Sequence, residues 1–205
     1  MIGVLALQGD FAAHGRMLDR LGIDWMLVKT PSQLARVDGL IIPGGESTTL
    51  LKLMKQDGFI EALPAFHAEG GVLFGTCAGL IVLAKDVLNP AQFSFGLIDL
   101  AVERNAYGRQ RESFESEGTA FLNGKATPLP MVFIRAPRIL ELRPGVTLLA
   151  RYDQEPVMAQ QGRVLVASFH PELTDDPRVH QYFVEMVATE RQAISIDSPV
   201  NNPVT

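Results

Sequence analysis

Short apolar runs alternate with segments of helical spacing through the first 90 residues, and this alternation constrains the fold more than any other feature. The apolar runs have the length of strands and occupy residues 2–7, 23–28, 40–42 and 72–74. Apolar residues at helical spacing predict helices at residues 10–21, from 47, at 60–67 and at 78–84. Continuous apolar strands are typical of sheets buried on both faces. We therefore expect an α/β fold, with a parallel sheet and right-handed crossover helices on both faces.

The second half of the chain has a different pattern. Strand-like runs separated by glycine and proline occupy residues 97–102, 131–134, 146–150, 157–159 and 164–167. This pattern favours an antiparallel extension of the same sheet over a second domain. A last helix is predicted from about residue 177 to 191. We expect one domain with a flavodoxin-like, open, mostly parallel sheet over residues 1–191, followed by a disordered tail at 192–205.

Composition disfavours several classes of function. Eighteen basic and 23 acidic residues give a net charge of −5, which does not suit a nucleic-acid partner. The single cysteine, Cys77, excludes an internal disulfide and a multi-cysteine zinc site. The apolar start of the chain lacks a basic lead-in and reads as a strand, not a signal peptide. No apolar run approaches the ~20 residues of a membrane span, so we expect a cytoplasmic protein without a membrane contact.

The sharpest local motif is Gly75-Thr76-Cys77-Ala78-Gly79. A buried strand leads into it and a helix leaves it, which is the pattern of a nucleophile elbow with sulfur in place of oxygen. The helix N-terminus favours a thiolate at Cys77, and the amide of Ala78 faces an oxyanion formed at an attacked carbonyl. The alternative is a buried structural cysteine, since free cysteine is often buried.

A second motif, His170-Pro171-Glu172, follows the run at 164–167. Proline keeps His170 extended, so that both side chains can project the same way. A carboxylate at Glu172 can then hold one ring nitrogen while the other faces a nucleophile. Taken alone, a surface loop with an incidental histidine is the better interpretation.

A third motif, Pro43-Gly44-Gly45-Glu46-Ser47, ends the third predicted strand. Glycine lets backbone amides approach a ligand closely, which makes Gly45 a candidate second oxyanion donor. The alternative is an ordinary strand-to-helix turn. All three motifs follow predicted strands, and sites in open parallel sheets form at the carboxyl ends of strands. We therefore expect the three motifs to meet at one edge.

At these motifs the chain resembles the class I glutamine amidotransferases, which use a Cys-His-Glu triad, and within them the glutaminase subunits of pyridoxal 5′-phosphate synthase. The stretches that carry the resemblance span roughly residues 1–190 and are 5–9, 43–49, 75–79, 104–110, 113–115, 133–137 and 170–174. The Gly-x-Cys-x-Gly and His-Pro-Glu pieces mark only the superfamily. The Arg-Asn-Ala-Tyr-Gly-Arg-Gln stretch at 104–110 is the discriminating one.

The resemblance implies hydrolysis of L-glutamine to glutamate and ammonia without a metal or cofactor. Cys77 would attack the amide, with His170 as acid and base and Glu172 as its orienting partner. The amides of Gly45 and Ala78 would form the oxyanion hole. Carried over from the family, the residues that bind glutamine are Gly45, Glu46, Ser47, Arg104, Ile134 and Arg135.

The resemblance also implies a partner. Ammonia in neutral water is mostly protonated, so a useful glutaminase delivers it through a channel. The family's acceptor is a (β/α)8 synthase subunit, joined in a hetero-oligomer, whose docking completes the oxyanion hole. The candidate contacts with this subunit are Gln8, Gly9, Asp10 and, by family analogy, His14. The alternatives are a glutaminase of histidine or purine synthesis, a cysteine hydrolase of another substrate, and a non-catalytic module.

Overall fold

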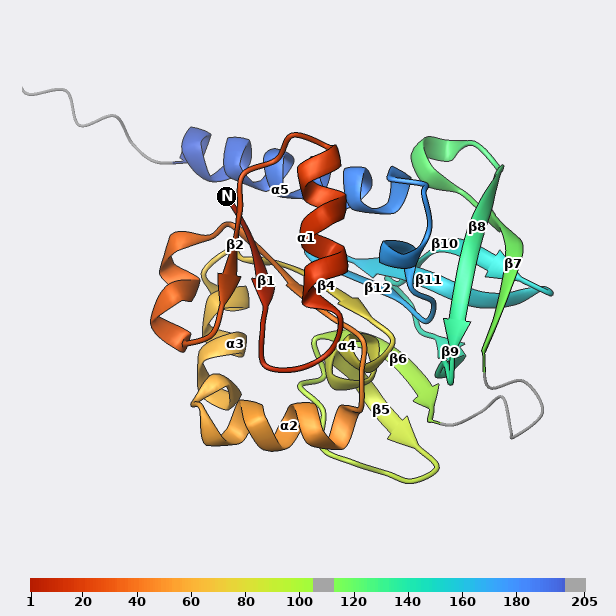
Figure 1. Ribbon diagram of the computed structural model, residues 1–205, viewed down its shortest axis with the longest axis horizontal. Helices are drawn as coiled ribbons and strands as arrows, with labels where there is room; N and C mark the ends of the chain where they lie inside the picture. Colours follow the sequence, from red (N-terminus) through yellow and green to blue (C-terminus); the bar gives the residue numbers. More distant parts are fainter. Residues whose placement is uncertain (105–112, 198–205) are drawn as a thin grey trace, which may run out of the picture.

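A nine-stranded sheet forms the centre of the molecule, a computed structural model that describes residues 1–104 and 113–197 (Figure 1). Its strands, in spatial order, are β2 (Trp25–Val28), β1 (Ile2–Leu5), β3 (Gly39–Ile42), β4 (Val72–Thr76), β12 (Val164–Ala167), β11 (Glu155–Gln161), β10 (Thr147–Tyr152), β7 (Ser113–Ala120) and β8 (Thr127–Ile134). The first five are parallel, and each later strand runs antiparallel to its neighbour. The parallel sheet and its antiparallel extension are thus both confirmed.

Helices cover both faces of the sheet. They are α1 (Phe11–Arg20), α2 (Ser47–Gln56), α3 (Phe59–Ala68), α4 (Ala78–Leu83) and α5 (Arg178–Asp197), with 3₁₀ turns η1 (Pro31–Arg36), η2 (Leu122–Gly124) and η3 (Pro171–Leu173). One core cluster joins α1 and α5 to the sheet through Leu18 and Phe183. The other joins η1, α2, α3 and α4 through side chains such as Leu34, Met54 and Leu63. Every residue of β1, β3, β4 and β12 is buried, because both faces of these strands are covered.

A second, three-stranded sheet beside α4 was not predicted (Figure 1). It contains β5 (Ala84–Leu88), β6 (Ile98–Glu103) and β9 (Arg138–Leu142). Two expectations are therefore wrong: Ala84 begins a strand instead of ending a helix, and the run at 97–102 does not extend the main sheet. The apolar run that α4 shares with Ala84 has no breaker in it, so periodicity alone does not mark the boundary.

The last helix is longer than predicted. Helix α5 continues to Asp197, so residues 192–197 are helical and not part of a disordered tail. The sequence after Arg191 contains no glycine or proline before Pro199, and nothing local therefore ends the helix earlier. The rest of the predicted tail, 198–205, lies outside the described residues. Among the helices that the structure describes, none is long and apolar enough to cross a membrane.

Candidate active site

Cys77 stands at a tight corner between β4 and α4. Its backbone has φ 49° and ψ −100°, which is rare for a residue other than glycine and costs on the order of 1–3 kcal/mol. The two flanking glycines allow the corner. A Cβ at Gly75 would lie 2.5 Å from the carbonyl carbon of Gly79, and one at Gly79 would lie 2.2 Å from the oxygen of Ile42. The predicted elbow is therefore present, and close backbone contacts hold it in place.

The thiol of Cys77 faces a cavity of about 130 Å³. The cavity is lined by Gly45, Glu46, Ser47, Cys77, Ile81, Arg104, Ile134, Arg135 and His170. Every residue that the sequence proposed for glutamine binding is in this set. Cys77 is 5% exposed, and its Sγ lies 3.9 Å from the carbonyl oxygen of Ile134. The sulfur is thus shielded from solvent yet open to a molecule in the cavity.

His170 follows β12 and lines the same cavity as Cys77, and Glu172 is two residues further along the chain. The Nδ1 atom of His170 is 2.7 Å from Oε1 of Glu172, and the backbone amide of His170 donates to the carbonyl of Val132. The Nε2 atom is buried and has no well-formed hydrogen bond within the described residues. One ring nitrogen is thus held by the carboxylate while the other is available for the thiol and its substrate.

The electrostatics of this pair favour a charged imidazole. Burial favours neutral His170, but interactions with Cys77 and Glu172 outweigh it and raise the pKa of His170 to about 10. Burial likewise opposes a charged Glu172, but His14 and the hydrogen bond from His170 lower the pKa of Glu172 to about 2. An imidazolium beside a thiol is the arrangement that generates a cysteine nucleophile.

Gly44 brings the two parts of the site together, and the sequence assigned it no role of its own. A Cβ at Gly44 would lie 2.4 Å from Cε1 of His170 and 3.2 Å from Cβ of Cys77. Only glycine therefore allows the β3 turn to pass so close to the thiol and the imidazole. The available signal for this role was the pair of adjacent glycines, Gly44 and Gly45, because a turn alone needs only the second of them.

The residues after Gly44 are held by the N-terminus of α2. The carboxylate of Glu46 accepts the amides of Thr48 and Thr49 at 3.0 and 2.7 Å. Burial acts against this carboxylate, but these bonds lower the pKa of Glu46 to about 2. Arg104 reaches the same carboxylate at 3.4 Å and Oγ1 of Thr48 at 3.2 Å. Opposite charges thus border the cavity, as a substrate with a carboxylate and an ammonium requires.

Two further side chains that contact the site were missed by sequence reasoning. Ser47 donates to Oε1 of Gln92 at 3.1 Å, and no local pattern marks Gln92. Ile81 lines the cavity from the first turns of α4. It lies four residues after Cys77, and helical spacing puts residues so related on one face. That spacing could have identified Ile81.

The loop between β1 and α1 lies against the candidate oxyanion hole. Gln8 accepts the amide of Glu46 at 3.2 Å, and a Cβ at Gly45 would lie 2.5 Å from the amide of Gln8. Gly9 and Asp10 are exposed, and Asp10 also caps α1 by accepting the amide of Ala13. The loop can therefore be touched from outside while it contacts Gly45.

His14 is not placed as predicted. It is 0% exposed, inside the face of α1 that packs on the sheet, so its side chain is not at the surface of this chain. The helical spacing of Phe11, His14 and Leu18 already put it on an apolar face. Family analogy had suggested the interface instead. His14 contacts Thr76, Glu172 and His180.

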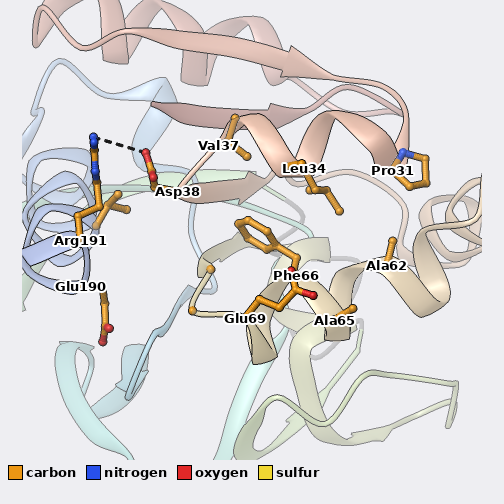
Figure 2. A pocket seen from close by; sticks show the side chains of 14 residues that line it. Pro31, Leu34, Val37, Asp38, Ala62, Ala65, Phe66, Glu69, Glu190 and Arg191 are labelled. Atoms are coloured by element: carbon orange, nitrogen blue, oxygen red, sulfur yellow. Dashed lines mark ion pairs between the residues drawn. The ribbon is translucent and has the colours of Figure 1, made fainter. Parts of the chain in front are cut away.

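A larger cavity lies elsewhere, between η1, α3 and α5 (Figure 2). Its volume is about 380 Å³, and Leu34, Val37 and Phe66 give it an apolar floor. Arg191 and Asp38 form an ion pair at its rim, 3.6 Å apart. It borders the residues that precede β3 and β4, at the amino-terminal ends of these strands, whereas ligands of open parallel sheets bind at the carboxyl ends. Its lining has no cysteine or histidine, so it offers no nucleophile with a base.

The described residues contain no group of three or more His, Cys, Asp or Glu arranged to hold a metal ion. The site instead has a thiol, an imidazole and a carboxylate arranged one after another in space. Ala78, the first residue of α4, follows Cys77 directly, and Gly45 lines the cavity that Cys77 faces. Such a set can carry out acyl transfer through a thioester.

Known proteins are similar to this chain in sequence and in fold. The chain is 54% identical to the pyridoxal 5′-phosphate synthase subunit PdxT of Koribacter versatilis over 186 residues, 91% of this chain and 95% of the relative. It is 50% identical to PdxT of Niallia circulans over 190 residues, 93% and 99% of the two chains. A crystal structure of a glutamine amidotransferase superposes with a TM-score of 0.85 at 47% identity, covering 91% and 98%.

A more distant structure, PurLQS of Thermotoga maritima, shares the fold alone, with a TM-score of 0.66 at 15% identity over 95% and 98% of the chains. The SNO glutamine amidotransferase family matches residues 4–189. With that match over most of its length, the chain belongs to the SNO glutamine amidotransferase family.

Proposed function

We propose that this protein is the glutaminase subunit of a pyridoxal 5′-phosphate synthase and hydrolyses L-glutamine to L-glutamate and ammonia. The observation that carries the proposal is the line from Cys77 through His170 to Glu172 at the edge of a cavity lined by opposite charges. Relatives at 50% identity and above are named as the PdxT subunit of that synthase. No observation favours the alternative, a glutaminase of histidine or purine synthesis.

The first half of the reaction forms a thioester. The Cys77 thiolate attacks the side-chain amide carbon, a C–S bond forms, and the carbonyl electron pair moves onto oxygen. Amides of Gly45 and Ala78 stabilise that oxyanion, a role worth roughly 100- to 1000-fold in rate per donor. The intermediate collapses with cleavage of the C–N bond, and the His170 imidazolium gives its proton to the departing nitrogen. Ammonia leaves, and His170 is neutral.

The second half releases glutamate. Neutral His170 takes a proton from water as the water oxygen attacks the thioester carbon. The second tetrahedral intermediate expels the thiolate, and the charged pair of Cys77 and His170 is restored. Glu172 stays ionised throughout, because its pKa is near 2, and supports His170 each time the ring is charged.

Two groups of cavity residues bind the two ends of glutamine. Arg104 supplies the positive charge for the α-carboxylate, and Glu46 the negative charge for the α-ammonium. Ser47, Ile134 and Arg135 border the side-chain amide together with Gly45. The predicted stretch at 105–110 follows Arg104 directly and lies outside the described residues.

The ammonia acceptor is a (β/α)8 synthase subunit in a hetero-oligomer. Gln8, Gly9 and Asp10 are the proposed contact, because the loop is reachable from outside and rests on Gly45. A partner that pushes on this loop acts on the candidate oxyanion donor directly. A free thiol nucleophile suits a reducing compartment, so we place the complex in the cytoplasm.

The test is ammonia release from L-glutamine by wild type and Cys77→Ala, each with and without the synthase subunit. We expect weak release by the isolated wild type, a clear increase on adding the synthase, and none from Cys77→Ala in either state. Equal rates with and without the partner contradict the loop's role. Full release by Cys77→Ala contradicts the chemistry.

A further inference from the structure

A buried polar chain extends behind the candidate triad and is not used by the mechanism above. Nδ1 of His14 lies 2.9 Å from Nε2 of His180, and both side chains are 0% exposed. Nε2 of His14 lies 3.3 Å from Oγ1 of Thr76 and 3.5 Å from Oε1 of Glu172. This row of polar contacts thus runs from α5 through α1 to the carboxylate that holds His170.

Burial keeps both of these imidazoles neutral. Desolvation lowers the pKa of His14, and it lowers the pKa of His180 to about 3, with His14 adding to that effect. The charged or titratable groups that act on His14 are Glu172 from η3, His170, Asp10 at the start of α1 and His180 from α5. A neutral imidazole has one N–H and one lone pair, so the chain has two possible polarities.

Only one polarity suits the carboxylate. If Nδ1 of His14 carried the proton, its Nε2 lone pair would point at the ionised Oε1 of Glu172, and the proton on Nδ1 of His180 would be a buried donor without a partner. With protons on Nε2 of both rings, His180 donates to His14, and His14 directs its proton between Thr76 and Glu172. The atom left over is then a lone pair on His180, which costs less than an orphaned N–H.

We propose that His14 is a positioning residue of the active site: held by His180, it directs its Nε2 proton at Glu172 and keeps that carboxylate aligned with His170. The contact with Glu172 is long and shared with Thr76, so its effect is electrostatic and orienting. A carboxylate has two oxygens, and Oε2 of Glu172 has no hydrogen-bond partner among the described residues. The pull from His14 on Oε1 therefore opposes rotation of the carboxylate away from His170.

The first test reads the protonation of each imidazole in the wild-type protein. The chain has four histidines, so ¹⁵N-labelled histidine gives a spectrum simple enough to assign by single substitutions. Long-range ¹H–¹⁵N correlations distinguish Nε2–H from Nδ1–H rings. We expect His14 and His180 to be neutral Nε2–H rings at pH 7. A charged His14, or one protonated on Nδ1 alone, overturns the proposal.

The second test reads the thiol directly. Cys77 is the only cysteine, so the pH dependence of iodoacetamide alkylation reports on it alone. His14→Leu removes the donor, whereas His14→Gln keeps an amide N–H near the position of Nε2. Without the donor Glu172 supports the imidazolium less well, so we expect the alkylation midpoint of His14→Leu to rise by about one pH unit and kcat with the synthase to fall about tenfold, with KM unchanged. His14→Gln should recover most of both effects.

His67→Leu is the matched control, because His67 is also partly buried but its Nδ1 contacts only the oxygen of Gly71, away from the site. It should keep the wild-type midpoint and kcat. A wild-type midpoint in folded His14→Leu contradicts the positioning role. So does a His14→Gln variant as impaired as His14→Leu. If His14→Leu does not fold, His180→Leu and His180→Gln are compared in the same way, because His180 holds His14. The inference rests on the proposed function, but the two can fail separately. A wild-type protein that does not hydrolyse glutamine would contradict the proposed function, whereas the alkylation profiles would still test the role of His14.

Discussion

The two parts of the active site, the corner after β4 and the turn after β12, are held by different means. After β4, backbone contacts between Gly75, Gly79 and Ile42 fix Cys77 at its corner. After β12, a side-chain hydrogen bond sets the position of His170, whose Nδ1 lies 2.7 Å from Glu172. The nucleophile is thus fixed by the path of the backbone, whereas the base depends on side-chain contacts, which His14 extends from α1. Changes at the first part should act on strain and access, and changes at the second on protonation.

The largest effect should come from removing the base. His170→Asn keeps a polar side chain of similar size but cannot shuttle a proton at neutral pH. We expect glutamine turnover in the presence of the synthase to fall about 1000-fold. The measurement is steady-state ammonia release, with His67→Asn as the control. A His170→Asn enzyme within tenfold of wild type would mean that another group acts as acid and base.

The next effect tests the place where the two parts of the site meet. In Gly44→Ala the new methyl group would press on Cε1 of His170 and approach Cβ of Cys77. A displacement of about 1 Å at reacting groups costs on the order of 100-fold, and we expect that loss in kcat.

Gly124→Ala is its control, because a Cβ there meets no atom within 4 Å and costs only strain at φ +75°. It should lose some stability but no activity. If Gly44→Ala retains wild-type kcat, the thiol and the imidazole are not in the close arrangement described.

A smaller effect concerns the pH dependence of stability at the side-chain contacts behind His170. Burial lowers the pKa of His180 in the folded protein to about 3, below its ordinary value of 6.5, so the unfolded chain takes up a proton first as pH falls. The stability linked to neutral His180 is present above pH 6.5 and is lost progressively down to pH 3. His180→Gln should reduce the slope of the unfolding free energy between pH 6.5 and 5 by up to about 1.4 kcal/mol per pH unit. Urea unfolding at several pH values measures it. An unchanged slope would place His180 in contact with water.

The smallest effect tests the corner at Cys77. Glycine adopts positive φ without strain, so Cys77→Gly should be more stable than Cys77→Ala by about 1 kcal/mol, although glycine usually destabilises. Both variants should lack activity. Thermal or urea unfolding of the two decides the sign. If the alanine variant is the more stable, the backbone at residue 77 is not held in the left-handed region.

Sequence reasoning found the parts whose geometry is local. The Gly-x-Cys-x-Gly spacing predicted the elbow, and the spacing of His170 and Glu172 predicted their hydrogen bond. It missed β5, because the apolar run of α4 continues into Ala84 without a breaker. It also misplaced His14, although helical spacing had put that residue on an apolar face.

What the sequence could not supply was long-range placement. Nothing local tells that His14 meets His180, which lies 166 residues away, or that Gly44 touches His170. Nor does a pattern mark Gln92 as the partner of Ser47. Such contacts depend on the order of strands in the sheet, where β12 lies between β4 and β11 although it is far from β4 along the chain.

The most direct measurement of the central claim is mass spectrometry of the acid-quenched complex during glutamine turnover. The thioester formed in the first half-reaction should appear as a γ-glutamyl adduct on the one peptide that contains Cys77, and it should be absent from Cys77→Ala. Ammonia release at the wild-type rate with no adduct on that peptide, or with an adduct elsewhere in the chain, would contradict the account.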